Sequence, residues 1–266
     1  MFLEFVQKYN SMRSNVGRPP TLSLMEQLLV VLIRLRVGLP EQDLSYRFDV
    51  SVTTISVVFS YWVNSLHDIL TQIPIWPTRS TVDKFMPMSF KEMYPTTRVI
   101  LDCTVLFIEV PSDYRNQSDT FSPYKSHNTA KGLIGITPNG FISLVSDLSP
   151  GRVSDNKLTR QSGLYDLLEP HDSMRSFLIR EDLDQKGVTL NVPPFLKGRS
   201  QLSAADEVET RRIANLRVHV ERVIGNAKTF RILSGIFPNS MADKLSKILK
   251  ICCYLNNFTN EPLLER

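Results

Sequence analysis

The sequence predicts an α/β fold over its larger part, preceded by a small all-α domain. Apolar residues recur at three- and four-residue steps from Ser23 to Val37, which is the spacing of one helix face. From Arg98 onward, runs rich in β-branched and aromatic residues alternate with helical patterns. Strands mixed with helices favour a sheet that is covered by helices.

Composition sets the class of protein. The 266 residues include 42% hydrophobic residues, enough for one large core or two modest ones. Lys and Arg number 31 against 27 Asp and Glu, a mild excess that is compatible with nucleic acid without requiring it. Three cysteines form neither a disulfide framework nor a zinc pattern, which favours a reducing compartment. We expect neither a secretory signal nor a membrane span, because the longest apolar run, Leu28 to Ile33, is too short.

The first 70 residues are predicted to form an arm and three helices. Residues 1–20 form the arm, in which Gly17-Arg-Pro-Pro20 reads either as a minor-groove element or as a linker. The helical domain covers residues 21–70. Its first helix starts at a capping box of Ser23 and Glu26 and ends at Gly38 and Pro40. Two more helices are predicted over 41–48 and 52–66.

The second and third of these helices suit a helix-turn-helix. In that motif the later helix presents its N-terminal side chains to the major groove. The hydroxyls of Ser51, Thr53 and Thr54 could meet phosphates or bases of DNA. A plain three-helix cap is the alternative, because no Arg or Lys occurs from Val52 to Trp62.

A proline-rich linker is predicted over 71–97 and a second domain over 98–258, with a tail over 259–266. The strand over 98–109 carries Asp102, a charge inside an apolar run. A polar loop over 112–124 follows. Asn139-Gly140 then separates two apolar runs between Leu133 and Val145, a strong hairpin signal.

The remaining elements complete the predicted order. A helix is expected over 155–168, a short strand over 176–179 and an edge element over 188–196 that contains two prolines. A long helix over 206–228 carries Glu221 beside its apolar stripe, and a final apolar helix covers 242–255. Three strands, a helix, a short strand and a late acid-bearing helix are the order of an RNase H-like fold.

Asp102 and Glu221 are the candidate metal ligands. Phosphodiester cleavage by two cations uses carboxylates from separate elements, and Mg²⁺ or Mn²⁺ accepts such hard oxygen ligands. Each residue could instead have a purely structural role. Asp102 could be a hydrogen-bonded structural carboxylate, and Glu221 could pair with Arg217 on the helix surface.

Several longer motifs resemble the PIF/Harbinger-type DDE transposases and the nucleases derived from them. The resemblance runs from about Arg18 to Phe258. The matching stretches are Leu-Arg-Val-Gly-Leu-Pro-Glu-Gln-Asp-Leu-Ser-Tyr-Arg-Phe-Asp-Val-Ser (35–51), Arg-Val-Ile-Leu-Asp-Cys-Thr (98–104), Tyr-Lys-Ser-His-Asn-Thr-Ala-Lys-Gly-Leu-Ile-Gly (124–135), Leu-Leu-Glu-Pro (167–170), Val-Thr-Leu-Asn-Val-Pro-Pro-Phe-Leu (188–196) and His-Val-Glu-Arg-Val-Ile-Gly (219–225).

The resemblance implies a DDE integrase-type catalytic domain behind a helix-turn-helix. Asp102 would be the first catalytic carboxylate and Glu221 the third, with Mg²⁺ or Mn²⁺ as cofactor. Asp155 would be an acid outside the metal triad. Lys125, His127 and Lys131 would lie near substrate phosphates, for which clustered cations are suited. It also implies DNA as partner, a Myb-like protein partner, a homo-oligomer and a nuclear location.

The chain departs from this pattern at the second catalytic carboxylate. After a Glu-Pro-Xaa-Asp-Ser segment, relatives usually run through Met-Ala-Asp-Arg-Gly-Phe, whose Asp is the second catalytic carboxylate. Here the segment Glu169-Pro-His-Asp-Ser-Met-Arg-Ser-Phe177 is about three residues shorter and lacks that Asp. Asp172 is the nearest stand-in, with Asp182 or Asp184 beyond it. Val57 and Val105 replace a basic and an acidic residue that are common in relatives. Two hypotheses follow: an active endonuclease using a displaced acid such as Asp172, or a transposase-derived protein with impaired or lost cleavage.

Overall fold

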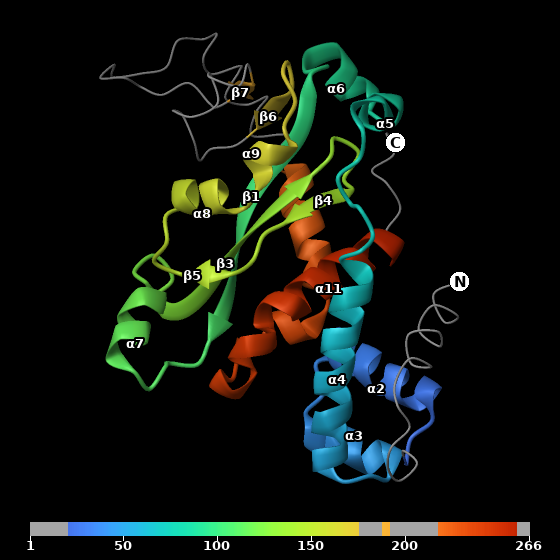
Figure 1. Ribbon diagram of the computed structural model, residues 1–266. Helices are drawn as coiled ribbons and strands as arrows, with labels where there is room; N and C mark the ends of the chain where they lie inside the picture. The colour runs from blue at the N-terminus through green and yellow to red at the C-terminus, as the bar shows by residue number, and fades with distance from the viewer. Residues whose placement is uncertain (1–20, 176–187, 192–217, 260–266) are drawn as a thin grey trace.

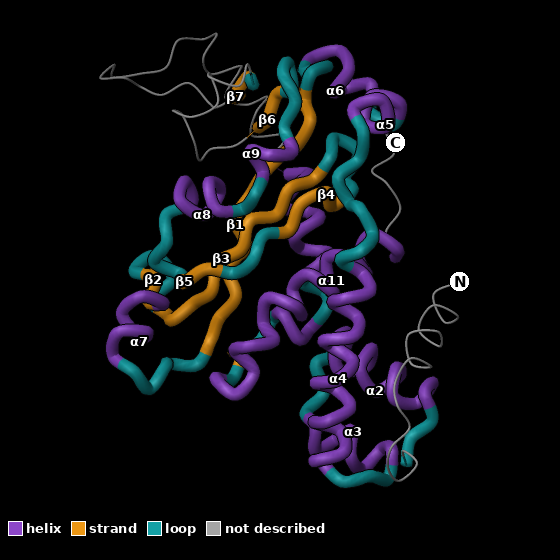
Figure 2. Tube along the Cα trace, in the orientation of Figure 1, coloured by secondary structure: helices purple, strands orange, loops and turns teal. Residues whose placement is uncertain are grey.

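The computed structural model describes residues 21–175, 188–191 and 218–259. The predicted arm over 1–20, the stand-ins Asp182 and Asp184, and the first part of the predicted long helix lie outside these residues. Helices, strands and loops of the described part are distinguished in Figure 2. None of its helices is both long enough and apolar enough to cross a membrane.

The helical domain forms three helices, as predicted. α2 (Leu24–Val37) begins at the capping box of Ser23 and Glu26 and ends at Gly38, whose φ of 73° is left-handed. α3 (Glu41–Phe48) and α4 (Val52–Leu70) follow, separated by a turn at Asp49. A small core made by Leu22, Val30, Leu44 and Ile55 holds the three together.

α4 extends four residues beyond its predicted end because its second half is buried. Trp62, Leu66 and Leu70 belong to the main hydrophobic cluster, which also contains Ile248 and Cys252 from α11 (Leu245–Thr259). The helical domain and the sheet domain therefore share one core. Figure 1 shows α4 reaching from α2 and α3 to α11, which lies against the sheet.

The segment predicted as a linker contains two short helices, α5 (Arg79–Lys84) and α6 (Met88–Met93). Thr78 caps the first helix and Pro87 precedes the second, so here the proline marks a helix start. Val82, Met86 and Phe90 are buried in the main core. The segment between the two domains is therefore packed against the rest of the chain through these apolar side chains.

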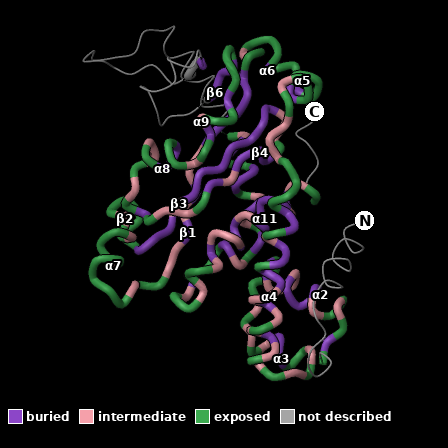
Figure 3. Tube along the Cα trace, in the orientation of Figure 1, coloured by how far each residue is buried: buried purple, intermediate pink, exposed green. Residues whose placement is uncertain are grey.

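The Asp102 strand and the hairpin form the centre of the sheet. β1 (Thr97–Ile108) pairs antiparallel with β3 (His127–Ile136), with Asp102 opposite Ile134. β3 returns through Asn139-Gly140 to β4 (Ile142–Val145), and Gly140 takes a φ of 84° in the turn. The predicted hairpin is confirmed, and Figure 3 shows both long strands buried along most of their length.

Smaller elements fill the predicted polar loop and the end of the hairpin. α7 (Tyr114–Thr120) lies in the region expected to be a loop and leads into β2 (Phe121–Ser122). Asp113 caps this helix through a hydrogen bond from the Asn116 amide. β5 (Ser149–Pro150) pairs with β3.

Three strands run parallel to β1 or to its neighbour. β6 (Ser173–Arg175) pairs with the start of β1, and β7 (Thr189–Asn191) extends the sheet beyond β6. Among the described strands, β7 therefore lies at an edge of the sheet, where the sequence predicted an edge element. β8 (Ile236–Phe237), which no sequence pattern indicated, pairs with the end of β1.

Helices cover both faces of the sheet. On one face, α8 (Asp155–Gln161) and α9 (Leu164–Leu167) pack over Val99 and Leu101. The predicted single helix over 155–168 is thus divided, and Gly163 with a φ of 76° lies at the division. On the other face, α11 and a helix over 218–227 pack over Ile100 and Leu106. This layering is consistent with an RNase H-like fold.

The chain between the last helices is built from short turns. η2 (Arg231–Leu233) and η3 (Asn239–Lys244) are 3₁₀ helices that flank β8. α11 starts at Leu245, three residues after the predicted start, because the preceding turn is η3.

Candidate functional site

Asp102 lies on the face of β1 that is covered by α11 and the helix over 218–227. Ile100 and Leu106, at even-numbered positions of this strand, belong to the core on that face, whereas Val99 and Leu101 belong to the core under α8. Side chains of a strand alternate between its faces, so Asp102 is on the same side as Ile100. Its side chain is half-buried. The sheet therefore presents this carboxylate toward the helix that carries Glu221.

The helix over 218–227 is held against β1 through its apolar stripe and through Lys228. Val220, Val223 and Ala227 are buried in the main core. Directly after this helix, the Nζ of Lys228 donates a hydrogen bond to the carbonyl oxygen of Val105 over 3.2 Å. Near the first described residue of this helix, the ring of His219 lies 6.0 Å from that of Phe90, in α6 just before β1. The helix therefore runs parallel to β1.

This arrangement brings Glu221 level with Asp102. Glu221 precedes Lys228 by seven residues, which is two helical turns on the same helix face and about 10 Å of axis. Asp102 precedes Val105 by three residues, which is also about 10 Å of strand. Lys228 contacts Val105. Moving about 10 Å from this contact toward the N-terminus of each element therefore reaches Glu221 on the helix and Asp102 on the strand. The two acids predicted as metal ligands thus come from adjacent elements at the same height. Glu221 is exposed, and both acids interact with other groups of the chain.

Two lysines lie near these acids. Burial lowers the pKa of Lys228, the nearby charge of Lys125 lowers it further, and the carboxylate of Asp102 raises it. The predicted phosphate contact Lys125 is therefore close to Lys228, which sequence reasoning missed. Its signal was available, because Lys228 lies two turns after Glu221 on the same helix face.

The predicted phosphate contacts have different surroundings. Lys125 is exposed, with its Nζ 4.8 Å from the ring centroid of Tyr124. His127 is exposed too, and its ring packs edge-on against Phe107 at 5.4 Å. Lys131 instead forms an ion pair of 2.8 Å with Asp155 and donates to the Val153 carbonyl. The positive charge of Lys131 is thus largely compensated within the protein.

Asp155 and Lys131 belong to the opposite face of the sheet from Asp102. Cys103 lies on this same opposite face. Burial is the main cause that raises the pKa of its thiol, and the negative charge of Asp155 raises it further. The Lys131–Asp155 ion pair connects β3 to the first turn of α8. This geometry supports the sequence interpretation of Asp155 as an acid outside the metal triad.

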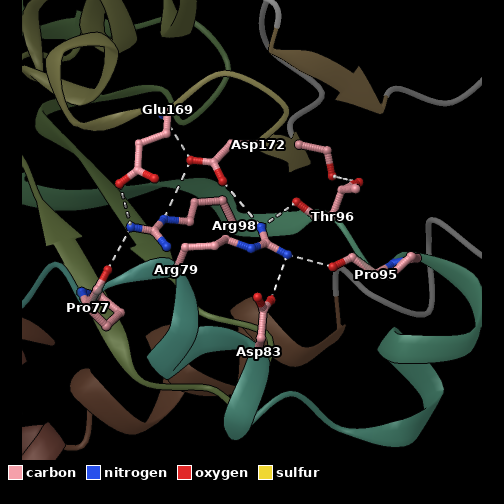
Figure 4. A network of polar contacts seen from close by, with 9 residues as sticks. Pro77, Arg79, Asp83, Pro95, Thr96, Arg98, Glu169 and Asp172 are labelled. Atoms are coloured by element: carbon pink, nitrogen blue, oxygen red, sulfur yellow. Dashed lines mark hydrogen bonds and ion pairs between the residues drawn. The ribbon is translucent and has the colours of Figure 1, made fainter.

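Asp172 lies in a buried ion network, shown in Figure 4. It is 2% exposed and approaches the Nη1 of Arg79 at 3.2 Å and the Nε of Arg98 at 3.6 Å. Its other polar partner is the backbone amide of Glu169, at 3.0 Å. The Nη2 of Arg98 also donates to the Pro77 carbonyl. Each partner is typical of a structural carboxylate that compensates buried arginines.

The strand register separates Asp172 from Asp102. Ser173 pairs with Thr97 at the start of β1, and Asp102 lies five residues further along, which is roughly 17 Å of strand. A metal ligand must approach its ion within a few tenths of an ångström of the ideal distance. The described position of Asp172 therefore argues against its role as the missing carboxylate.

The donor set fits a divalent cation by chemistry but is incomplete. Asp102 and Glu221 supply the hard oxygen ligands that Mg²⁺ and Mn²⁺ prefer. Within residues 21–175, 188–191 and 218–259, no three His, Cys, Asp or Glu side chains come together as a metal site. The described part of the chain thus provides two carboxylates from adjacent elements and no third.

The predicted DNA-contacting hydroxyls of the helical domain are partly used in capping. Ser51 accepts a hydrogen bond from the Thr54 amide, and the two hydroxyls lie 2.9 Å apart. Thr53 is exposed, and so is Val57, about one helical turn further along α4. The start of α4 therefore offers Thr53 as its exposed hydroxyl, beside an apolar side chain.

All three arginines between residues 20 and 72 have partners inside the protein. Arg34 pairs with Glu41 at 3.1 Å and Arg47 with Asp43 at 2.7 Å. Arg36 donates to the Thr229 hydroxyl and lies over the Phe230 ring. The same stretch contains five acidic residues and no lysine. Its charge is thus unfavourable for attracting DNA phosphates.

Comparison with protein families identifies two matching models. The model of the DDE superfamily endonuclease matches residues 101–257, which include Asp102, Glu221 and Lys228. The model of the helix-turn-helix of DDE superfamily endonuclease matches residues 20–72, which include α2, α3 and α4. A comparison with curated proteins and with solved structures finds no match. The first model covers more than half of the chain, which therefore belongs to the DDE superfamily endonucleases.

Proposed function

We propose that this chain is a transposase-derived DNA-binding protein of the PIF/Harbinger type whose metal-dependent DNA cleavage is impaired or lost. The observation that carries the proposal is the placement of Asp172. This stand-in for the second catalytic carboxylate is buried between Arg79 and Arg98, roughly 17 Å along the sheet from Asp102. Its charge already balances two guanidinium groups.

The chemistry of the family explains why a missing carboxylate matters. Divalent cations activate the nucleophile and stabilise the leaving oxygen in phosphodiester cleavage. Asp102 and Glu221 are the described residues that would hold such a cation. With two ligands in place of three, binding would be weaker, and removal of one catalytic ligand typically costs orders of magnitude in rate.

The test is nicking of supercoiled DNA with millimolar Mg²⁺ or Mn²⁺. We expect the purified chain to nick no faster than Asp102→Asn or Glu221→Gln. Asp166→Asn, which changes an exposed acid of α9, controls for a general loss of negative charge. Nicking that Asp102→Asn and Glu221→Gln abolish while Asp166→Asn retains it would overturn the proposal.

Metal binding separates impaired from lost cleavage. Isothermal calorimetry with Mn²⁺ on the same variants measures the site without requiring turnover. Saturable binding that both Asp102→Asn and Glu221→Gln remove would indicate an impaired but surviving site. Absence of binding in the unsubstituted chain would indicate that the site is lost.

The alternative is an active endonuclease, favoured by the placement of Asp102 level with Glu221. In this reading a displaced acid such as Asp172 completes the site. Asp172→Asn would then abolish nicking with little change in the free energy of unfolding. A structural role predicts the reverse, which is a large loss of stability.

The partner and location follow from the same proposal. We infer that DNA is the ligand, that the protein acts in the nucleus, and that a Myb-like protein or a second copy assists binding. The engaged arginines of the helical domain favour help from a partner. Comparing DNA affinity with and without nuclear extract, and measuring mass in solution by light scattering, tests these inferences.

A further inference from the structure

The turn between β2 and β3 presents a tyrosine and a lysine side by side. Tyr124 is 88% exposed, although it is a large aromatic residue. The Nζ of Lys125 lies 4.8 Å from the centroid of the Tyr124 ring. Among the described residues, no acidic side chain forms an ion pair with Lys125. The ammonium group and the ring face that it does not cover are therefore open to a ligand.

The turn holds these two side chains in place. Pro123 restricts the backbone, and the Lys125 amide donates a hydrogen bond to the Ser122 carbonyl over 3.1 Å, which closes a β-turn. The Nδ1 of His127 lies 3.0 Å from the Lys125 carbonyl oxygen. The His127 ring in turn packs edge-on against Phe107 of β1. A surface that is already ordered loses less conformational entropy when a ligand binds.

A second lysine lies close to this turn. Burial, and then the positive charge of Lys125, lower the pKa of Lys228, so the two ammonium groups are near each other. Lys228 is fixed to β1 by its hydrogen bond to the Val105 carbonyl. Figure 2 shows β2 and β3 at the end of the sheet next to α7. Two lysines from separate elements form a positive region here, which attracts phosphates.

An exposed aromatic ring beside a cation is suited to a nucleic-acid strand that has an unpaired base. The base stacks on the ring while a phosphate of the strand meets the cation. Inside a duplex each base is paired and is stacked between its neighbours, so its flat face is not available to a protein ring. Such a ring therefore favours unpaired bases, and it does so with little sequence preference because every base has a flat face.

We propose that Tyr124 stacks on an unpaired base of the DNA while Lys125 contacts a phosphate of the same strand. This inference rests on the proposed function, because it requires DNA to be the ligand. It adds the class of DNA, which is a single strand or a duplex with an unpaired end. It requires neither a bound metal ion nor cleavage.

Binding of two matched DNA ligands to the full chain tests the proposal. One is a duplex with a single-stranded overhang, and the other is the same duplex with blunt ends. Fluorescence anisotropy at one salt concentration measures both affinities. Tyr124→Leu removes the aromatic face but keeps an apolar side chain, whereas Tyr124→Phe keeps the face. Tyr114→Leu is the matched control, because Tyr114 is 86% exposed and no cation of the described residues lies over its ring.

We expect Tyr124→Leu to weaken binding of the overhang duplex by about fivefold or more, which is the effect of losing one stacked base. Binding of the blunt duplex should change by less than about twofold, because its bases are paired. Tyr124→Phe and Tyr114→Leu should bind both ligands within about twofold of the unsubstituted chain.

The outcomes separate this inference from the proposed function. If the unsubstituted chain binds DNA and Tyr124→Leu binds the overhang duplex equally well, the stacking is overturned and the proposed function stands. Equal losses on both ligands would also overturn the stacking alone. If the unsubstituted chain binds neither ligand, both fail. A lower molecular mass of Tyr124→Leu in solution, with unchanged DNA affinity, would assign the ring to a contact between copies and overturn the proposal.

Two further readouts distinguish stacking from a general loss of affinity. An overhang that contains 2-aminopurine should lose fluorescence on binding to the unsubstituted chain or to Tyr124→Phe, because stacking quenches this base analogue, and should keep it with Tyr124→Leu. The slope of log affinity against log salt concentration should be the same for Tyr124→Leu and the unsubstituted chain, because the substitution removes no charge. An unquenched complex of the unsubstituted chain, or a smaller slope for Tyr124→Leu, would contradict the stacking.

Discussion

Lys228 donates a hydrogen bond from its Nζ to the Val105 carbonyl over 3.2 Å, and this contact aligns the last acid-bearing helix with the central strand. Glu221 lies two turns before Lys228, and Asp102 lies three residues before Val105. The alignment therefore brings the two family acids to the same height. Lys228 acts as a positioning residue for this arrangement.

Replacing Lys228 by methionine should loosen the helix over 218–227. Lys228→Met keeps the long apolar stem but leaves the Val105 carbonyl without this donor, which should cost about 1 kcal/mol of unfolding free energy. Lys228→Arg should retain most of the stability. Urea denaturation of the three proteins measures the difference. A Lys228→Met variant as stable as the parent would show that the hydrogen bond does not hold the helix.

Replacing Asp172 by asparagine should destabilise the fold strongly. The side chain of Arg98 is 1% exposed, and Asp172→Asn would leave its buried charge without its main partner. Breaking one side of a buried ion pair costs about 3 to 5 kcal/mol. Asp83→Asn is the control, since Asp83 pairs with the same Arg79 at 2.8 Å but is 52% exposed. We expect that variant to lose less than about 1 kcal/mol in urea denaturation.

The prediction for Asp172 also separates the two functional hypotheses. A catalytic stand-in would tolerate the change to asparagine with little loss of stability, because a metal site is an addition to the fold. A loss confined to nicking, with an unchanged urea midpoint, would therefore contradict the structural role.

Local patterns sufficed to predict most helices and the central hairpin. The capping box at Ser23 and the left-handed position at Gly140 each act within a few residues, so the sequence displays them directly. The failures came from long-range packing. α4 continues to Leu70 because α11 covers it, and the proline-rich segment forms α5 and α6 because Phe90 packs into the same core.

The sequence predicted which residue types form the site better than it predicted which of them contact one another. Asp102 and Glu221 were identified from an acid within a strand and from a resemblance, and the structure brings their elements together. Lys131 was expected near phosphates, but its partner Asp155 is 24 residues away and could not be inferred from local spacing. The partners of Asp172, Arg79 and Arg98, come from the segment interpreted as a linker and from β1.

Acid should destabilise the protein partly through His219. Burial, and then the charge of Arg222, lower the pKa of His219 from its ordinary value of 6.5. Below that ordinary value the unfolded chain binds a proton that the folded chain does not, so stability falls as the pH drops toward the lowered pKa. His219→Gln should therefore lose less unfolding free energy than the parent between pH 7.5 and a pH of about 5.5.

Arg222→Gln provides the matched variant for this pH dependence. It removes the second cause of the lowered pKa and leaves the burial of His219 in place. We expect an intermediate loss of stability on acidification, between those of the parent and of His219→Gln. Identical pH profiles for all three proteins would exclude His219 as the source of the acid sensitivity.

Lys125 and Lys131 should contribute differently to DNA binding. Lys125 is exposed and close to Lys228, whereas Lys131 is compensated by Asp155 at 2.8 Å. A lysine that neutralises one phosphate contributes about one unit to the slope of log affinity against log salt concentration. We therefore expect Lys125→Gln to weaken binding and to reduce that slope by about one, measured by fluorescence anisotropy from low to moderate salt. Lys131→Gln should leave the slope unchanged, because the carboxylate of Asp155 already compensates the positive charge of Lys131. An equal reduction by both variants would show that the Asp155 ion pair opens when DNA binds.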